Sequence, residues 1–114
     1  MQSKKEIVMK KFPKEFQSAS DYAHLISRYL PEGTEIYLFG SYAKGSPKKS
    51  SDIDIGILAK DLSTIPKSEY REIDRQLMYD TINIDARIEP HLISVKHDVC
   101  NFSKIISDTG IQLI

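Results

Sequence analysis

The apolar positions of the chain change their period along its length, and each change predicts a different element. From about residue 14 or 18 to residue 30 they recur every three or four residues, which predicts a helix with one apolar face. That face comprises Phe16, Ala19, Tyr22, Ala23, Ile26, Tyr29 and Leu30. A shorter lysine-rich amphipathic segment, residues 4–11, is interrupted by Pro13, and residues 31–33 (Pro-Glu-Gly) end the longer helix.

Residues 35–39 and 52–58 have the composition of two strands. The first, Glu-Ile-Tyr-Leu-Phe, is rich in β-branched and aromatic residues. The second alternates strictly, so its isoleucines share one face and its aspartates the other. The two sets are Ile53, Ile55 and Ile57, and Asp52, Asp54 and Gly56. Between the strands, residues 41–44 can begin a short helix, and residues 45–51 form a polar turn.

The remaining third of the chain predicts two helices and further strands. A helix is expected from Lys67 to about Ile82, a third strand over residues 83–88, and a helix over residues 98–108. Pro90 marks a bend or a sheet edge, and residues 111–114 can add a short strand. We therefore expect an α+β fold, with a small β-sheet flanked by helices in a single domain over residues 1–114.

Composition narrows the classes of function. The 114 residues include sixteen basic and sixteen acidic ones, so the formal charge is +0. Such a chain lacks the positive field of a general nucleic-acid binder, which argues against long duplex substrates but not against a nucleotide or a tRNA end. The single cysteine, Cys100, excludes an internal disulfide and a thiolate zinc site. With no signal peptide or apolar membrane span visible, we expect a cytoplasmic protein.

The two aspartates of the second strand are the first candidates for chemistry. Asp52 and Asp54 lie on one strand face, roughly 6.5–7 Å apart at the backbone. Their repulsion, on the order of 2.5 kcal/mol at an effective dielectric near 20, is a cost that bound Mg²⁺ would reverse. A pair of metal ions held there could activate a nucleophile and neutralise phosphates. Taken alone, the pair could equally be two solvated aspartates on an exposed strand face.

The turn that ends the first strand supplies the second half of a site. Gly40 lets the backbone approach a ligand, and Ser41 offers a hydroxyl and an N–H at a helix start, where anions are favoured. Lys44, with Lys48 or Lys49, can add positive charge for a triphosphate. Alone, the turn could be an ordinary strand-to-helix connection capped by serine. Its combination with the aspartates is much more specific.

A third acid would complete metal coordination or accept the proton of an attacking hydroxyl. Asp85, Arg87 and Glu89 alternate along the predicted third strand and would share a face. We favour Asp85 as the third ligand, with Arg87 orienting carboxylates or contacting phosphate, and Glu89 as the alternative acid. A salt-bridged polar face is the simpler explanation of the same pattern. His91, after the strand, is a further candidate for substrate contact.

These segments resemble a known family. Gly40-Ser41, ten further residues, and Asp52-Ile53-Asp54 are similar to the signature of the DNA polymerase beta-like nucleotidyltransferase superfamily, and the length resembles its minimal nucleotidyltransferase branch. Residues 84–90 resemble its third catalytic strand, in which arginine follows an acid by two residues. The resemblance spans about residues 35–90 and implies a catalytic core over about residues 34–94. Lys44 stands where relatives often have arginine.

The resemblance implies a fold, a reaction and its cofactors. It implies a mixed sheet flanked by helices, with Asp52 and Asp54 binding two Mg²⁺ ions, or Mn²⁺, and Asp85 binding the catalytic one. Gly40 and Ser41 would hold the triphosphate. Members of the family transfer a nucleoside monophosphate from ATP or another NTP to a hydroxyl and release pyrophosphate.

Three functions remain open on the sequence. The first is a nucleotidyltransferase, AMP being the expected group. The second is an antitoxin or regulatory subunit that binds a HEPN-type toxin or a helical substrate-binding partner without needing catalysis. The third is a structural domain without nucleotide function. The tyrosines of the helices could form a core or an interface with a partner or a second copy of the chain. They are Tyr22, Tyr29, Tyr70 and Tyr79.

Overall fold

The computed structural model describes residues 2–114, and its centre is a four-stranded mixed sheet. The strands are β1 (Glu35–Phe39), β2 (Ile53–Ala59), β3 (Ile88–Ser94) and β4 (Ile111–Gln112). Their order is β3-β2-β1-β4. β1 pairs antiparallel with both β2 and β4, whereas β2 and β3 run parallel. The α+β class and the mixed sheet expected from the sequence are confirmed.

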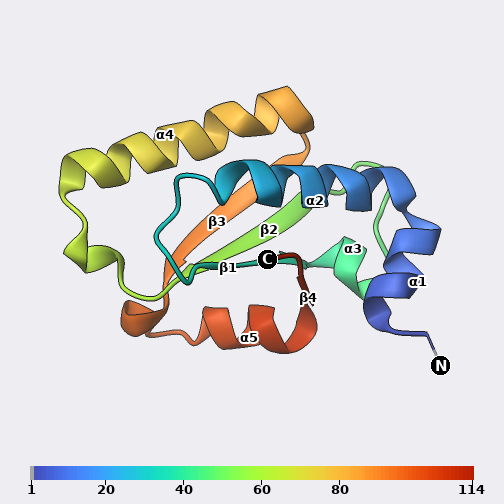
Figure 1. Ribbon diagram of the computed structural model, residues 1–114. Coiled ribbons are helices and arrows are strands. Elements are labelled where there is room, and N and C mark those ends of the chain that lie inside the picture. The colour runs from blue at the N-terminus through green and yellow to red at the C-terminus, as the bar shows by residue number, and fades with distance from the viewer. Residues whose placement is uncertain (1) are drawn as a thin grey trace.

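Helices cover both faces of this sheet. They are α1 (Lys4–Lys11), α2 (Pro13–Ile26), α3 (Ser41–Lys44), α4 (Lys67–Ile84) and α5 (Phe102–Thr109), with 3₁₀ turns η1 (Leu62–Thr64) and η2 (Val95–His97). In Figure 1, α2 and α4 lie on one side of the strands and α5 on the other. Parallel strands need a long crossover, and α4 supplies it between β2 and β3.

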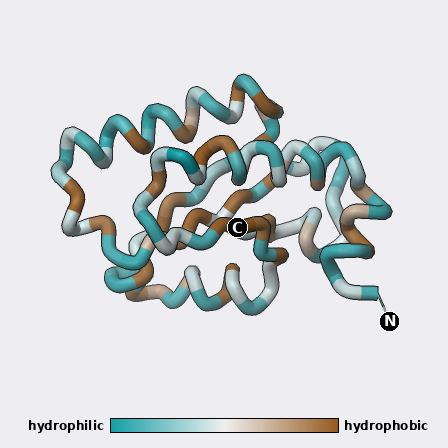
Figure 2. The backbone as a smooth tube through the Cα atoms, viewed as in Figure 1, coloured by the Kyte–Doolittle hydropathy of each residue, from teal (hydrophilic) through white to brown (hydrophobic). Residues whose placement is uncertain are grey.

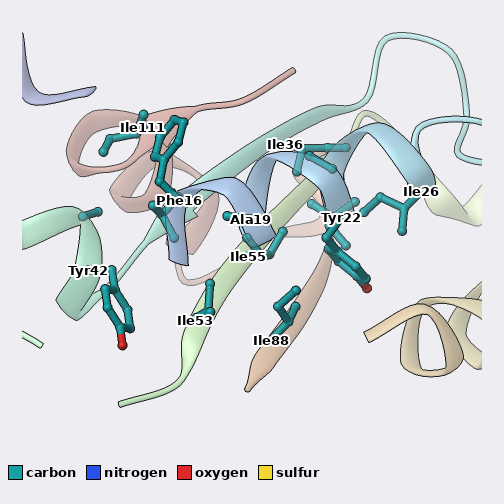
Figure 3. Packing of buried hydrophobic residues seen from close by; sticks show 14 of the residues in the cluster. Phe16, Ala19, Tyr22, Ile26, Ile36, Tyr42, Ile53, Ile55, Ile88 and Ile111 are labelled. Atoms are coloured by element: carbon teal, nitrogen blue, oxygen red, sulfur yellow. The ribbon is translucent and has the colours of Figure 1, made fainter. Parts of the chain in front are cut away.

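The main apolar core lies between the sheet and α2. Ile53, Ile55 and Ile57 point into it and are 0% exposed. In Figure 3 the apolar side chains of α2 pack onto the strands. Those labelled are Phe16, Ala19, Tyr22 and Ile26. Each large side chain buried in this way contributes roughly 1.5–3 kcal/mol. The colouring in Figure 2 agrees, because hydrophobic colour follows the strands while α4 alternates between hydrophobic and hydrophilic positions.

A smaller cluster on the opposite face holds α5. Tyr37, Leu58 and Ile106 form it. α5 approaches the sheet closely because Gly56 has no side chain: a Cβ there would lie 2.8 Å from Cγ2 of Ile106. Asp54 lies on this same face, beyond Gly56 along β2, because alternate residues of a strand point the same way. The aspartates therefore belong to the α5 side of the sheet.

The third strand differs from its prediction. α4 continues to Ile84, and Asp85 caps it with extended backbone angles. The Asp85 side chain then accepts a hydrogen bond from the Arg87 N–H at 3.0 Å, which stabilises a turn where a strand over residues 83–88 was expected. The strand begins only at Ile88 and runs through Pro90, which is tolerated because β3 is an edge strand. The Ile53 N–H donates to the Arg87 carbonyl at 2.9 Å where the two strands meet.

Two helix boundaries also differ from the sequence prediction. α2 ends at Ile26 rather than Leu30, and just beyond it the Ser27 hydroxyl donates to the His24 carbonyl at 2.8 Å. α5 begins at Phe102 rather than near residue 98, because Asp98 lies before the helix and accepts from the Ser103 N–H at 2.6 Å. Among residues 2–114, none of the helices combines the length and apolar character that crossing a membrane requires.

Candidate active site

The turn after β1 is built around Gly40. This residue has φ of 77°, a backbone conformation that residues with a side chain rarely adopt. A Cβ there would also overlap the carboxylate of Asp54. The turn continues into the single helical turn α3, which Gly45 ends in a left-handed conformation. Tyr42 fixes α3 to the core: it is 5% exposed and meets the Phe12 ring edge-on at 5.4 Å between centroids. The predicted strand–turn–short helix is confirmed, and it directs Gly40 onto Asp54.

The sheet register brings a second carboxylate beside Asp54. In the parallel ladder of β2 and β3, Asp54 pairs with Glu89. Paired residues of neighbouring strands lie about 4.8 Å apart and point to the same face. Asp52 immediately precedes β2 and is exposed. The structure thus gathers Asp52, Asp54 and Glu89 at one end of the β2–β3 ladder.

His91 joins this cluster from the same strand as Glu89. Its Nε2 lies 3.5 Å from Oδ1 of Asp54 and 3.7 Å from Oε1 of Glu89. One donor atom from each of these three residues lies within 4.8 Å of the others. The sequence prediction placed His91 beyond the third strand as a candidate for substrate contact. A strand continued through Pro90 would have placed it on the face of Glu89, two residues away.

The carboxylates are electrostatically crowded. Burial raises the pKa of Asp54, and the neighbouring Asp52 raises it further, although His91 acts in the opposite direction. The pKa of Glu89 is also raised, first by its interaction with the Asp52 carboxyl group and then by partial burial. Negative charges held together in this way favour a cation, and carboxylate oxygens are the ligands that hard divalent ions prefer. The donor set therefore fits a divalent metal ion.

Asp85 and Arg87 lie outside this cluster, contrary to the prediction that they share a strand face with Glu89. Arg87 donates to Asp85 at 2.9 Å and meets Glu15 of α2 at 3.5 Å. Hydrogen bonds from Arg87 hold the pKa of Asp85 below its usual range. The pair links the end of α4 to α2. Residues 85–87 form the turn between α4 and β3. The first acidic residue of the strand is therefore Glu89, and it lies beside Asp54 where Asp85 was expected.

The predicted phosphate-binding residues lie on the turn and the loop that follow β1. Ser41 is half-buried at the start of α3, and the side chains of Lys44, Lys48 and Lys49 are exposed. Their ammonium groups are therefore solvated. Binding of nucleotide by Gly40, Ser41 and Lys44 stays a prediction. Arg87 pairs with Asp85 and Glu15, and its contact with phosphate likewise stays a prediction.

Comparison with known proteins agrees with this geometry. The sequence profile of the family described as polymerase beta, nucleotidyltransferase matches residues 24–113. Protein adenylyltransferase MntA of Shewanella oneidensis is 49% identical over 37 residues, which are 32% of this chain and 27% of MntA. The matched segment therefore spans about a quarter of the length of that relative.

Two solved structures share the fold. One is a crystal structure of a toxin–antitoxin with AMP-PNP, with a TM-score of 0.57 and 26% identity over 83% of this chain and 72% of that chain. The other, a mutant of the toxin–antitoxin MntA–HpeT, has a TM-score of 0.56 over the same shares and, at 23% identity, supports the fold alone. Because the family profile covers most of the sequence and the strands place its acids together, this chain belongs to the polymerase beta nucleotidyltransferase family.

Proposed function

We propose that this protein transfers a nucleoside monophosphate, AMP in the first instance, from an NTP to a hydroxyl group with release of pyrophosphate. The observation that carries the proposal is the meeting of the Gly40 turn with Asp54 and Glu89 on one face of the sheet. A turn with free N–H groups suits phosphate, and adjacent carboxylates suit divalent ions. Membership of the nucleotidyltransferase family supports the same reaction.

The acids have a metal-holding role in this proposal. Asp52, Asp54 and Glu89 would hold two divalent ions, Mg²⁺ or Mn²⁺, and Glu89 would take the place that the sequence favoured for Asp85. When bound, such ions neutralise phosphate charge and favour ionisation of the attacking hydroxyl. Burial raises the pKa of Asp54, and the Asp52 carboxyl group raises that of Glu89; both support this assignment, because a bound cation would stabilise the ionised carboxylates.

The reaction forms one bond and breaks another at the α-phosphorus. The acceptor oxygen bonds to that phosphorus, and the bond from it to the oxygen bridging to the β-phosphorus breaks. The two outer phosphates leave as pyrophosphate, and the hydroxyl proton passes to a carboxylate of the cluster. Gly40 and Ser41 hold the phosphates, and Lys44 adds a positive charge beside them. Positioning of the reactants accounts for a large part of such catalysis.

The transferred group and the partner follow from the relatives. MntA is named a protein adenylyltransferase, and one structural neighbour contains AMP-PNP, so ATP is the proposed donor. The neighbour at 26% identity is a toxin–antitoxin structure, so the proposed acceptor is a hydroxyl of a partner toxin. The HEPN class of that toxin is what the family resemblance implies. A protein acceptor also agrees with the zero net charge, which gives no general attraction for nucleic acid.

A label-transfer assay tests the reaction. The protein is incubated with Mg²⁺, ATP labelled at the α-phosphate and host lysate, beside the Asp52→Asn/Asp54→Asn double variant and a sample with ATP labelled at the γ-phosphate. We expect α-label on a macromolecule with the wild type only, and no transfer of the γ-label. Transfer of the γ-label would indicate a kinase, and equal α-labelling by the double variant would exclude this site.

A second function, binding of a partner without catalysis, is favoured by one feature of α4. Met78, Tyr79 and Ile82 are 55%, 59% and 74% exposed, which leaves an apolar strip on the outer side of the helix. A purely binding antitoxin would still neutralise its toxin after Asp52→Asn/Asp54→Asn, whereas a catalytic one would not. The comparison requires co-expression of the toxin and measurement of growth with each variant.

A further inference from the structure

The imidazole of His91 has a nitrogen, Nε2, that lies beside the carboxylates of Asp54 and Glu89. Within residues 2–114, Nε2 is buried and has no hydrogen-bond partner. Its distances to Asp54 and Glu89, 3.5 Å and 3.7 Å, exceed those of good N–H···O hydrogen bonds. A buried polar atom without a partner costs about 1–3 kcal/mol, so its position requires an explanation.

Aromatic packing, rather than hydrogen bonding, orients this ring. Phe39 of β1 meets His91 edge-on with 5.2 Å between ring centroids. Phe102 of α5 meets it in the same manner at 6.3 Å and also packs against Phe39 at 5.6 Å. Aromatic side chains from β1 and α5 therefore hold the ring of this β3 residue with Nε2 directed at the carboxylates.

The three donor atoms lie close enough together to be drawn onto one ion. An octahedral ion with bonds of about 2.1 Å separates adjacent ligand atoms by about 3 Å and opposite ones by about 4.2 Å. The separations from Nε2 to the two carboxylate oxygens lie between these limits, and all three donors lie within 4.8 Å of one another. Small side-chain rotations would bring them onto one ion.

We propose that His91 is a metal ligand and that the site takes a divalent first-row transition ion, with Mn²⁺ as the probe, in preference to Mg²⁺. Mg²⁺ prefers oxygen ligands, whereas imidazole favours transition ions. The inference rests on the metal site of the proposed function. It deepens that proposal, because His91, which is not one of the three acids, would determine which ion the site prefers. Removing His91 would lower the affinity for Mn²⁺ more than that for Mg²⁺.

The test measures metal binding in the absence of nucleotide. Mn²⁺ is titrated into the wild type, His91→Gln and His97→Gln, with free Mn²⁺ followed by electron paramagnetic resonance and Mg²⁺ added as competitor. His97 is the matched control because it pairs with Asp61, 3.3 Å away, and not with the cluster. We expect wild-type Mn²⁺ affinity at least about tenfold above that for Mg²⁺. His91→Gln should lose at least about tenfold for Mn²⁺ and less than threefold for Mg²⁺.

Pulsed electron paramagnetic resonance of bound Mn²⁺ gives a signature that a packing role would not produce. We expect nitrogen coupling in the wild type and in His97→Gln, and its loss in His91→Gln. A wild-type spectrum without nitrogen coupling, coupling that persists in His91→Gln, or failure to bind Mn²⁺ would overturn the inference. The wild-type spectrum alone is decisive if the variant does not fold.

The two proposals fail separately. Nitrogen coupling in a protein that transfers no nucleotide label contradicts the proposed reaction and supports His91 as a ligand. Label transfer by a protein without nitrogen coupling supports the reaction and contradicts the role of His91.

Discussion

The two faces of the central sheet differ in whether their polar groups have hydrogen-bond partners. On the α2 and α4 side, the few buried polar groups have partners: Tyr22 donates to the Leu77 carbonyl at 2.7 Å. Asp80 accepts from Tyr29 at 2.9 Å and from Gln76 at 3.0 Å. On the α5 side, carboxylates crowd one another beside an imidazole nitrogen without a partner. The same strand, β2, contributes apolar residues to one face and acids to the other.

The difference separates a face whose buried polar groups are paired from the face that carries the proposed site. Burial and the neighbouring Asp80 raise the pKa of Tyr29 well above its usual range, so its hydroxyl remains a donor. The hydrogen bonds of Tyr22, Tyr29 and Asp80 are all made within the folded chain and require no ligand. The α5 side instead holds crowded carboxylates and an unpaired imidazole nitrogen, an arrangement typical of functional sites. Changes on the two faces should therefore have different signatures.

The largest effect on activity is expected from substitution of Glu89, which pairs with Asp54 across β2 and β3. Glu89→Gln should lower the rate of nucleotide transfer about a thousandfold, or about 4 kcal/mol of barrier, because it removes a charge from the metal-holding cluster. Asp85→Asn is the matched control and should change the rate less than about threefold. Label transfer measured under single-turnover conditions checks both. The reverse ranking would restore Asp85 as the third acid.

On the opposite face, truncation should cost stability. Ile55 is 0% exposed, and Ile55→Ala should lower the free energy of unfolding by about 2–5 kcal/mol through lost burial and a cavity. Ile105, 56% exposed on α5, provides the control, because Ile105→Ala should cost less than about 0.5 kcal/mol. Urea titration followed by circular dichroism measures both. A similar loss at the two positions would contradict the assignment of the core.

A smaller effect is expected from the hydrogen bond that Tyr29, just after α2, donates to Asp80 of α4. Tyr29→Phe removes one of two hydrogen bonds to the buried Asp80 and should cost about 1–2 kcal/mol of unfolding free energy. Tyr79 is 59% exposed on the same helix as Asp80, so Tyr79→Phe should be neutral within about 0.5 kcal/mol. Thermal unfolding at several pH values below 9 checks the difference. A neutral Tyr29→Phe would show that this face does not depend on polar satisfaction.

The smallest expected effect is a gain in stability, in contrast to the losses above, and it depends on pH. The pKa of Asp54 is raised in the folded protein, so the folded state binds its proton more tightly than the unfolded state. Wild-type stability should therefore fall as the pH rises from about 4, the unfolded value, through the raised folded value. With a chelator present, Asp54→Asn should gain less than about 1 kcal/mol at pH 7, because solvent screens a partly exposed carboxylate. The gain should vanish toward pH 4.

Asp61 provides a control of contrary sign for this pH dependence. Hydrogen bonds from Ser63 lower its pKa to about 2, so ionised Asp61 stabilises the fold above about pH 4 and the benefit is lost as the pH falls toward 2. Asp61→Asn should therefore destabilise the protein at pH 7 and have no effect near pH 2. Guanidinium titrations across this range measure both variants. Loss of stability in Asp54→Asn at pH 7 would contradict the crowding of the site.

The sequence was most informative where local pattern determines structure. Alternation along residues 52–58 predicted a strand with isoleucines on one face and aspartates on the other, and β2 has this arrangement. The strand over residues 35–39 and the short helix over residues 41–44 were also confirmed. In these segments the side-chain period and the glycine turn are properties of a few neighbouring residues, and tertiary contacts agree with them.

The third strand shows why the rest could not be predicted. Ile84 and Ile88 are spaced as on a strand, but the helical pattern of α4 continues through Ile84, and a bond from Arg87 to Asp85 then makes a turn. The alternation of Asp85, Arg87 and Glu89 does not by itself locate the residue at which the strand begins. What determines the start of β3 is its parallel pairing with β2, a contact across more than thirty residues of sequence. The choice of Asp85 over Glu89 followed from that missing contact.

The position of Pro90 has a consequence for association between chains. Because the Ile53 N–H bonds to the Arg87 carbonyl, the odd-numbered residues of β3 direct their backbone groups to β2. The nitrogen of Pro90 therefore faces the outer edge, where it has no hydrogen to donate. An incoming strand would find this gap between Glu89 and His91, so continuous pairing of two sheets edge to edge is blocked there. The residue that separates Glu89 from His91 therefore also interrupts the hydrogen-bonding edge of the sheet.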